Sequence, residues 1–382
     1  MVISTSELSD PRSWPPAPAA PPWPAVRAAL DAPTRDEAET HDASARAWLR
    51  ARLDAGEGEA LARAFAQAPS FALARHLHRL AADVLRTYGP HGALRTVLFA
   101  LPIVIVAALG ESRAPVTLSG VLTNARPIAD RLRVARAFGG AETFALAPAL
   151  VAAHALDWHA LPGLLRRSRL GDRADASENV ALAPLDLSPS PICVDTEEER
   201  VHLRFMVGAI LAAPRVDPLA GATLGREGIA LARAVGDALK APGVSLLTLP
   251  RAPQSLSLAV ATGRAAQREV AAQVFASNAI RRLRRAYGEP TAIISAHRAD
   301  DAPGGGELRL SLSSPFATKA AEGFRCAIQP SERVQDVAAM LDALLRDCQV
   351  GDVRVEPGIH GDVDPVTGQP LFFKHPGADA LH

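Results

Sequence analysis

The sequence predicts an α+β protein in which two α/β layers pack together after a leading helical region. The C-terminal layer is predicted to be a ferredoxin-like (split βαβ) antiparallel sandwich. Residues 97–109 form an uncharged run rich in β-branched side chains, which is typical of a strand buried on both faces. Residues 70–90 repeat apolar side chains every three or four positions, as an amphipathic helix does. The last third alternates between strand and helix patterns, and this order predicts the sandwich.

The apolar run 97–109 indicates a buried strand and not a membrane span. A helix that crosses a bilayer needs about 20 apolar residues, and this run is shorter. Arg95 precedes it, Glu111 follows it, and Pro102 within it would interrupt a helix. We therefore expect a strand at the centre of a protein core and no contact with a membrane.

The N-terminal residues predict a flexible arm. Prolines crowd residues 10–25, and proline cannot donate a backbone hydrogen bond. Trp14 and Trp23 are candidates for contact with a partner, and the alternative is a leader that contacts nothing. The predicted division of the chain is a proline-rich arm (1–33), a helical region (34–90), a first α/β region (91–213) and a C-terminal ferredoxin-like region (214–382).

Helical patterns precede and follow the buried run. Ser70 is expected to cap a helix over about 71–88, which Gly89 and Pro90 end. Further helices are expected near 127–138 and near 148–168. Residues 200–212 begin as an alternating strand and become fully apolar.

The last third gives the clearest succession of elements. A helix is expected over about 264–287, with Thr262 as its cap. Leu308, Leu310 and Leu312 alternate with Arg309, Ser311 and Ser313, as in a strand with one apolar face. Ser331 is expected to cap a helix that reaches about 347. The other expected strands are 244–249, 291–297, 324–328 and 352–355.

Composition narrows the class of protein. The chain has 41 basic and 41 acidic residues, and this zero net charge argues against a dedicated nucleic-acid binder and a polybasic membrane-surface protein. Three scattered cysteines do not form a disulfide framework. The first ten residues lack the basic and apolar stretches of a secretory signal. We therefore expect a cytoplasmic protein.

Three short apolar segments resemble those of a family of uncharacterised, mainly betaproteobacterial proteins known only as a domain of unknown function. They are Leu98-Phe99-Ala100-Leu101-Pro102-Ile103-Val104, Leu203-Arg204-Phe205-Met206-Val207-Gly208-Ala209-Ile210, and Val353-Arg354-Val355-Glu356 followed by Thr367-Gly368-Gln369-Pro370-Leu371-Phe372-Phe373. The resemblance covers most of the chain beyond residue 60. It implies a bacterial cytoplasmic protein, and it implies no activity, cofactor or site residue.

One cluster has the composition of a metal site. His360, Asp362 and Asp364 place an imidazole and two carboxylates within five residues, which are ligand types for a divalent cation. The alternative is a hairpin turn, since Asp364 is followed by Pro365 and the segment is rich in turn residues. We favour the turn and predict neither a metal nor a cofactor.

One cluster has the composition of a nucleic-acid contact. Arg281, Arg282, Arg284 and Arg285 lie in the last turns of the expected helix 264–287. Cations stabilise the carbonyl end of a helix without any ligand, and no aromatic platform flanks them. We favour a solvated helix end and keep these arginines as candidates for partner binding.

No catalytic signature is present. The chain has neither a Gly-x-Ser-x-Gly elbow nor a phosphate-binding Walker loop. The sequence therefore predicts a non-catalytic binding, scaffolding or regulatory protein whose partner is a protein. The alternatives are an enzyme with an unrecognised site, and a nucleic-acid accessory protein that uses the Arg281–Arg285 helix end.

Overall fold

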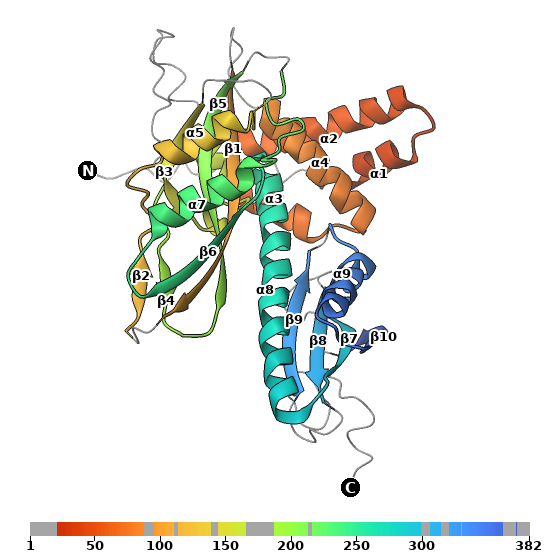
Figure 1. The fold of residues 1–382 in the computed structure, drawn as a ribbon. Coiled ribbons are helices and arrows are strands. Elements are labelled where there is room, and N and C mark those ends of the chain that lie inside the picture. Colours follow the sequence, from red (N-terminus) through yellow and green to blue (C-terminus); the bar gives the residue numbers. More distant parts are fainter. Residues whose placement is uncertain are drawn as a thin grey trace, which may run out of the picture.

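The computed structural model describes most of the chain, and Figure 1 shows its arrangement. The described residues are 21–87, 95–110, 114–138, 144–165, 187–212, 216–298, 306–314, 321–329, 331–361 and 372. Helices and two four-stranded sheets combine in an α+β fold, which confirms the predicted class. Among the described residues, no helix is long and apolar enough to cross a membrane.

Four helices form the leading region. They are α1 (Trp23–Asp31), α2 (Arg35–Ala55), α3 (Gly58–Ala66) and α4 (Phe71–Thr87). Ser70 caps α4 as predicted, because its Oγ accepts a hydrogen bond from the Leu73 N–H at 3.3 Å. Leu73, Leu77 and Leu80 are buried on the inner side of α4.

The proline-rich arm that the sequence predicts over residues 1–33 is too long, because its last part is helical. Residues 23–31 are helix α1, with Val26 fully buried. Pro24 lies in the first turn, where a missing N–H costs no helical hydrogen bond. Proline at this position is therefore a helix start and not the sign of an extended arm. Residues 1–20 lie outside the described part of the chain.

The first sheet is antiparallel and has the order β3-β5-β1-β6. Its central strand β1 contains the run that the sequence analysis placed at the core, and it is buried on both faces. Helices α4 and α8 cover one face of the sheet, and α5 and α7 cover the other. The bounds are β1 (Arg95–Leu109), β3 (Phe144–Val151), β5 (Arg200–Ala212), β6 (Val244–Pro250), α5 (Arg126–Val134) and α7 (Glu227–Leu239). Two short strands, β2 (Val116–Leu118) and β4 (Ile192–Val194), pair beside it.

Pro102 is tolerated inside β1 because it lies beyond the part of β1 that pairs with β6. The last pair between β1 and β6 joins Ile103 to Pro250, so Pro102 lies just beyond that ladder. Its carbonyl oxygen still accepts a hydrogen bond from the Arg251 N–H at 2.8 Å. A proline that has no ladder partner for its nitrogen costs the sheet nothing.

Gly208 makes room for the aromatic centre of the first sheet. It lies on β5 directly opposite Phe99 of β1. A Cβ added to Gly208 would overlap the Phe99 ring and the Ala145 carbonyl oxygen. We expect Gly208→Ala to lower the free energy of unfolding by about 2–3 kcal/mol, as overpacked cores do. Urea unfolding measures this, with Gly351→Ala as the control, because a Cβ there meets no atom within 4 Å. Equal stability of the two variants would contradict the expected overlap.

Helix α8 (Leu256–Tyr287) joins the two halves of the molecule (Figure 1). Its first half packs on the first sheet through side chains that include Leu256, Ala259 and Val270. Its second half packs on the second sheet through side chains that include Ala276, Ile280 and Leu283. One continuous helix of 32 residues therefore contributes to both cores.

The second sheet has the order β10-β7-β8-β9. Strands β7, β8 and β9 are antiparallel neighbours, whereas β10 returns parallel to β7 after α9. The bounds are β7 (Thr291–Arg298), β8 (Gly306–Ser313), β9 (Ala321–Ile328), α9 (Val334–Asp347) and β10 (Asp352–His360). Helices α8 and α9 cover one face, where Leu308, Leu310 and Leu312 are buried as predicted.

The ferredoxin-like order predicted for residues 214–382 is not seen. That prediction used strand 244–249 as the first strand of the C-terminal sheet. The strand exists as β6, but it pairs with β1 in the first sheet. Pairing between strands far apart in sequence depends on tertiary packing, which a local pattern does not contain. Consequently the expected boundary at residue 213 does not separate the two cores.

Two local predictions also differ from the structure. Helix α8 begins at Leu256 after Ser255, eight residues before the predicted start. The Thr262 hydroxyl lies within the helix and donates to the Leu258 carbonyl at 2.9 Å, so Thr262 is not a cap. The expected helix 148–168 begins instead with the end of β3 and a single 3-10 turn (Ala153–Ala155).

Candidate functional site

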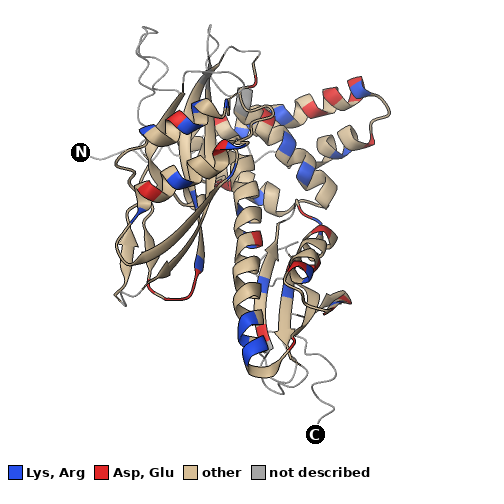
Figure 2. Ribbon diagram, in the orientation of Figure 1, with Lys and Arg blue, Asp and Glu red and all other residues tan. Residues whose placement is uncertain are grey.

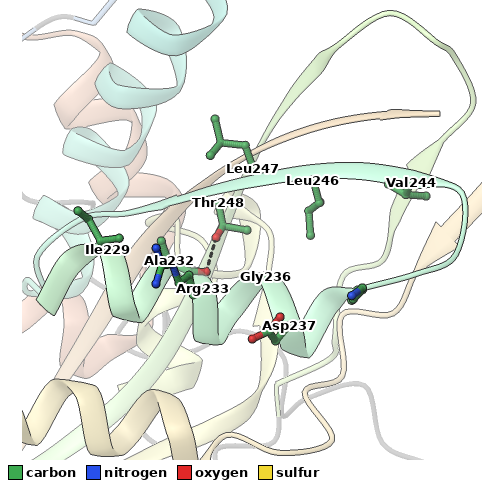
Figure 3. A pocket seen from close by; sticks show the side chains of 10 residues that line it. Ile229, Ala232, Arg233, Gly236, Asp237, Val244, Leu246, Leu247 and Thr248 are labelled. Atoms are coloured by element: carbon green, nitrogen blue, oxygen red, sulfur yellow. Dashed lines mark hydrogen bonds between the residues drawn. The ribbon is translucent and has the colours of Figure 1, made fainter. Parts of the chain in front are cut away.

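A groove lies between α7 and β6 on the first sheet (Figure 3). We call it the α7–β6 groove, and its volume is about 530 Å³. Side chains of α7 form one wall: Ile229, Ala232, Arg233, Gly236, Asp237 and Lys240. The other wall consists of Val244, Leu246, Leu247 and Thr248 of β6.

The two walls are held together by a hydrogen bond and by apolar packing. The Thr248 hydroxyl donates to the Ala232 carbonyl oxygen at 2.6 Å (Figure 3). Val244 and Leu246 pack with α7 against the core on that face of the sheet. Leu246 points toward α7, and Leu247 points away from it. The groove is therefore a fixed feature of the fold, with β6 anchored at one end of it.

The outer edge of β6 is open within the described part of the chain. β6 is the last strand of its sheet and pairs only with β1 among these residues. Gly110 donates to the Gly243 carbonyl and Arg251 donates to the Pro102 carbonyl, so odd-numbered positions face β1. Backbone groups alternate in direction along a strand. Those of Leu246 and Thr248 therefore point outward, beside the groove.

Large apolar side chains are exposed at the groove. Ile229 on α7 is 69% exposed and Leu247 on β6 is 55% exposed. Ala232 and Gly236 are one helical turn apart on α7, and neither fills the space between the walls. An open strand edge beside exposed apolar side chains is a surface that pairs readily with another segment.

A second polar feature lies on the face of the second sheet that α8 and α9 do not cover. Glu307 and Arg309 of β8 are both buried, and Arg309 has no exposed surface. The Glu307 carboxylate accepts hydrogen bonds from the Nε of Arg309 and from the Nε of Arg325 on β9. Arg309 and Arg325 are direct cross-strand partners, so this carboxylate separates two like charges.

Ser295 and His297 on β7 belong to the same buried face. The Ser295 Oγ and the His297 Nε2 are 2.8 Å apart, and the His297 Nδ1 lies 2.7 Å from the Gly361 carbonyl oxygen. Because a carbonyl only accepts, Nδ1 carries the proton, and neutral Nε2 accepts from the serine hydroxyl. Burial lowers the pKa of His297, which keeps the imidazole neutral. Both side chains are at most 2% exposed, and the His297–Gly361 hydrogen bond links β7 to the residue that follows β10.

Basic residues gather at the C-terminal end of α8 (Figure 2), and two of the four arginines of the predicted cluster pair with other residues of the protein. Arg282 pairs with Glu322. Arg284 donates to Glu289 at 3.1 Å and to the Gln349 carbonyl at 3.0 Å. Arg281, Arg282 and Arg285 are exposed, and Arg284 is half-buried. Two of the four predicted candidates, Arg282 and Arg284, thus make ion pairs within the protein while three lie at the surface.

The other sequence-predicted candidates are not brought together in one site. Trp23 is half-buried and packs against the core between the leading helices and the first sheet. His360 ends β10, with its ring 5.7 Å from that of His297. Trp14, Asp362 and Asp364 lie outside the described residues, so the predicted turn stays a prediction.

Comparison with protein-family models, with curated proteins and with solved structures gives no match to the chain. The resemblance noted from the sequence therefore stays a prediction. What the chain can do must be argued from its own geometry.

Sequence reasoning missed the α7–β6 groove because one of its walls is β6, the strand that was assigned to the other sheet. A partial signal exists in α7, whose polar side carries the isolated apolar residue Ile229. The buried polar face was missed for another reason. Arg309, Ser311 and Ser313 alternate with leucines, and this pattern predicts a solvent-exposed face.

Proposed function

We propose that this protein is a non-catalytic binding protein that captures an extended segment of a partner protein in the α7–β6 groove. The single observation that carries the proposal is the open outer edge of β6 beside that groove. An extended segment would add to the first sheet as a fifth strand. Main-chain hydrogen bonds then give affinity, and alternate side chains give specificity.

The backbone of β6 supports this mode of binding. The N–H and C=O groups of Leu246 and Thr248 point outward, so one short segment can form four hydrogen bonds there. A small molecule would satisfy few of these groups at once. A polypeptide in a β conformation satisfies all of them, which is why we propose a peptide segment as the occupant.

The side chains around the groove define what the segment contains. Ala232 and Gly236 leave space for side chains that point toward α7, and Ile229 offers an apolar contact to them. Leu247 offers a second apolar contact on the opposite face of the added strand. Arg233, Asp237 and Lys240 border the groove with charges of both signs. We infer a segment that is apolar at alternate positions and polar at its ends.

The test begins with a displayed library of nine-residue peptides selected on the full chain. A selected peptide is then synthesised with N-methyl groups on alternate amides in each of the two registers. We expect one register to abolish binding and the other to preserve it, because only alternate amides face β6. Isothermal titration calorimetry measures both affinities. Equal binding by the two methylated forms, or no selected peptide, would rule out strand addition.

Protein variants complete the test. Leu246→Pro removes an N–H that β1 does not use, and proline is tolerated on an edge strand. We expect it to weaken peptide binding at least about tenfold relative to the matched variant Leu246→Ala. Ile229→Glu changes a side chain that is 69% exposed, so it tests the groove without a risk to folding. Light scattering tests whether a second copy of this chain occupies the groove. A dimer that Leu246→Pro dissociates would show that the occupant is another molecule of this chain and not a segment of a different protein.

A further inference from the structure

A second cavity lies where the leading helices, α8 and α9 meet. We call it the α4–α8–α9 cleft, and its volume is about 960 Å³. It lies in the upper part of the range of about 300–1,000 Å³ that is usual for small-molecule sites. It shares no residue with the α7–β6 groove. The inference drawn from it is therefore independent of the proposed function.

The cleft has cations on two opposed elements. Arg75 and Arg79 extend from α4, and Arg333 precedes the first turn of α9. The Asp42 carboxylate accepts a hydrogen bond from the Arg79 guanidinium at 2.9 Å, and it also pairs with His76. The Arg333 guanidinium lies 5.0 Å from the centre of the Phe71 ring, which positions it on the α4 side of the cleft.

The acidic residues of the cleft are mostly engaged by other arginines. Glu332 accepts two hydrogen bonds of 2.6 Å from Arg268, which is a bidentate pair. Glu269 lies 3.7 Å from Arg251. In the described part of the chain, five arginines and three carboxylates line the cleft: Arg75, Arg79, Arg251, Arg268, Arg333, Glu269, Glu332 and Asp336. The balance of lining charges is positive, and the excess lies on the α4 wall, because Arg333 and Asp336 of the α9 wall carry opposite charges.

The floor of the cleft is apolar. Helix α8 contributes Leu258, Ala261, Ala265 and Ala266, and α9 contributes Val337 and Met340. Leu258 is 40% exposed. An apolar floor between walls that each carry arginine complements a molecule that has an apolar body and an anionic end group.

His78 adds a neutral polar group to the α4 wall. Its ring packs 4.6 Å from the ring of Phe65, and its Nδ1 is buried without a hydrogen-bond partner among the described residues. A neutral imidazole can donate or accept one hydrogen bond and repels neither an anion nor an apolar chain. His78 therefore does not prevent an amphipathic molecule from lying along the α4 wall.

We propose that the α4–α8–α9 cleft binds an amphipathic anion whose carboxylate or phosphate lies between Arg75 and Arg333 and whose apolar body covers the α8 floor. The anion would make charge-assisted hydrogen bonds to guanidinium groups, which bind either head group well. The apolar body would cover Leu258 and Met340 and remove them from water.

The experiment uses four probes that share a twelve-carbon chain and differ in their head group. Dodecanoate, dodecyl phosphate, dodecyltrimethylammonium and dodecanol are titrated into the full chain by calorimetry below their micelle concentrations. We expect one anion to bind per chain, and the cation and the alcohol to bind at least about tenfold more weakly. The stronger of the two anions identifies the head group as carboxylate or phosphate. Equal binding of the cation, several bound anions per chain, or no anion bound would overturn the proposal.

Arginine variants locate the bound anion. We expect Arg75→Gln and Arg333→Gln each to weaken anion binding about tenfold, because each removes one charge-assisted hydrogen bond. Arg281→Gln is the matched control, since it removes the same charge at the far end of α8. Unchanged binding by both cleft variants, with normal circular dichroism, would place the anion elsewhere and overturn the proposal. Peptide binding in the α7–β6 groove should be unaffected by all three substitutions.

Discussion

Glu307→Ala is expected to lower the free energy of unfolding by about 3–5 kcal/mol, the largest effect of any single substitution considered. The reason is the burial of Arg309, which has no exposed surface and donates its Nε hydrogen to Glu307. Removing the carboxylate takes a close countercharge and hydrogen-bond acceptor away from this buried guanidinium, and breaking a buried ion pair costs far more than losing a surface contact.

Two further variants separate this mechanism from a general effect of mutation. Arg325→Gln removes the other partner of Glu307, but the Arg325 side chain is 55% exposed, so we expect a loss of less than about 1 kcal/mol. Adding Arg309→Met to Glu307→Ala removes the buried positive charge as well, and we expect it to restore most of the lost stability. Guanidinium chloride unfolding measures all four proteins. A Glu307→Ala variant as stable as Arg325→Gln would contradict the role assigned to this carboxylate.

The second large effect is a dependence of stability on pH that comes from His78. Burial lowers the pKa of His78 from 6.5 to about 4. Between these values the unfolded chain binds a proton that the folded chain does not, so the free energy of unfolding rises with pH. The contribution of His78 is complete above about pH 6.5 and is lost as the pH falls toward 4. Its full size is about 3 kcal/mol.

His78→Phe tests this contribution. Phenylalanine keeps an aromatic ring against Phe65 and Trp158 and has no titratable group. We expect the difference in unfolding free energy between the variant and the natural chain to change by about 3 kcal/mol from pH 7 to pH 4 in favour of the variant. Other histidines and carboxylates contribute equally to both proteins and cancel. A constant difference over this range would show that His78 titrates normally in the folded protein.

Local sequence patterns predicted which segments form helices and strands better than they predicted which strands pair with each other. The run 97–109 is a buried strand, Ser70 caps a helix, and Leu310 faces the core as the alternation predicts. Each of these depends on residues close in sequence. The pairing of β6 with β1 joins positions more than 130 residues apart, and no local spacing specifies it.

The candidate sites were less predictable than the fold for the same reason. The α7–β6 groove depends on which strand is at the edge of a sheet, and the α4–α8–α9 cleft depends on how three distant helices meet. Arg75 and Arg333 are 258 positions apart in the chain, and neither belongs to a charge cluster. The arginines that do cluster, at 281–285, include two that the protein uses internally. Charge density along the sequence therefore points to the C-terminal end of α8, whereas the proposed anion site lies beside its first half.

Because α8 runs through both cores, a division of the chain between these cores would have to cut this helix. At about 1.5 Å per residue, its 32 residues span about 48 Å, with apolar side chains committed at both ends. A fragment that begins at residue 214 would keep β6 and the first half of α8 while losing the sheet that covers them. We therefore expect the two halves to fold as one unit, and we expect exchange of one half for an unrelated domain to disrupt the core of the other.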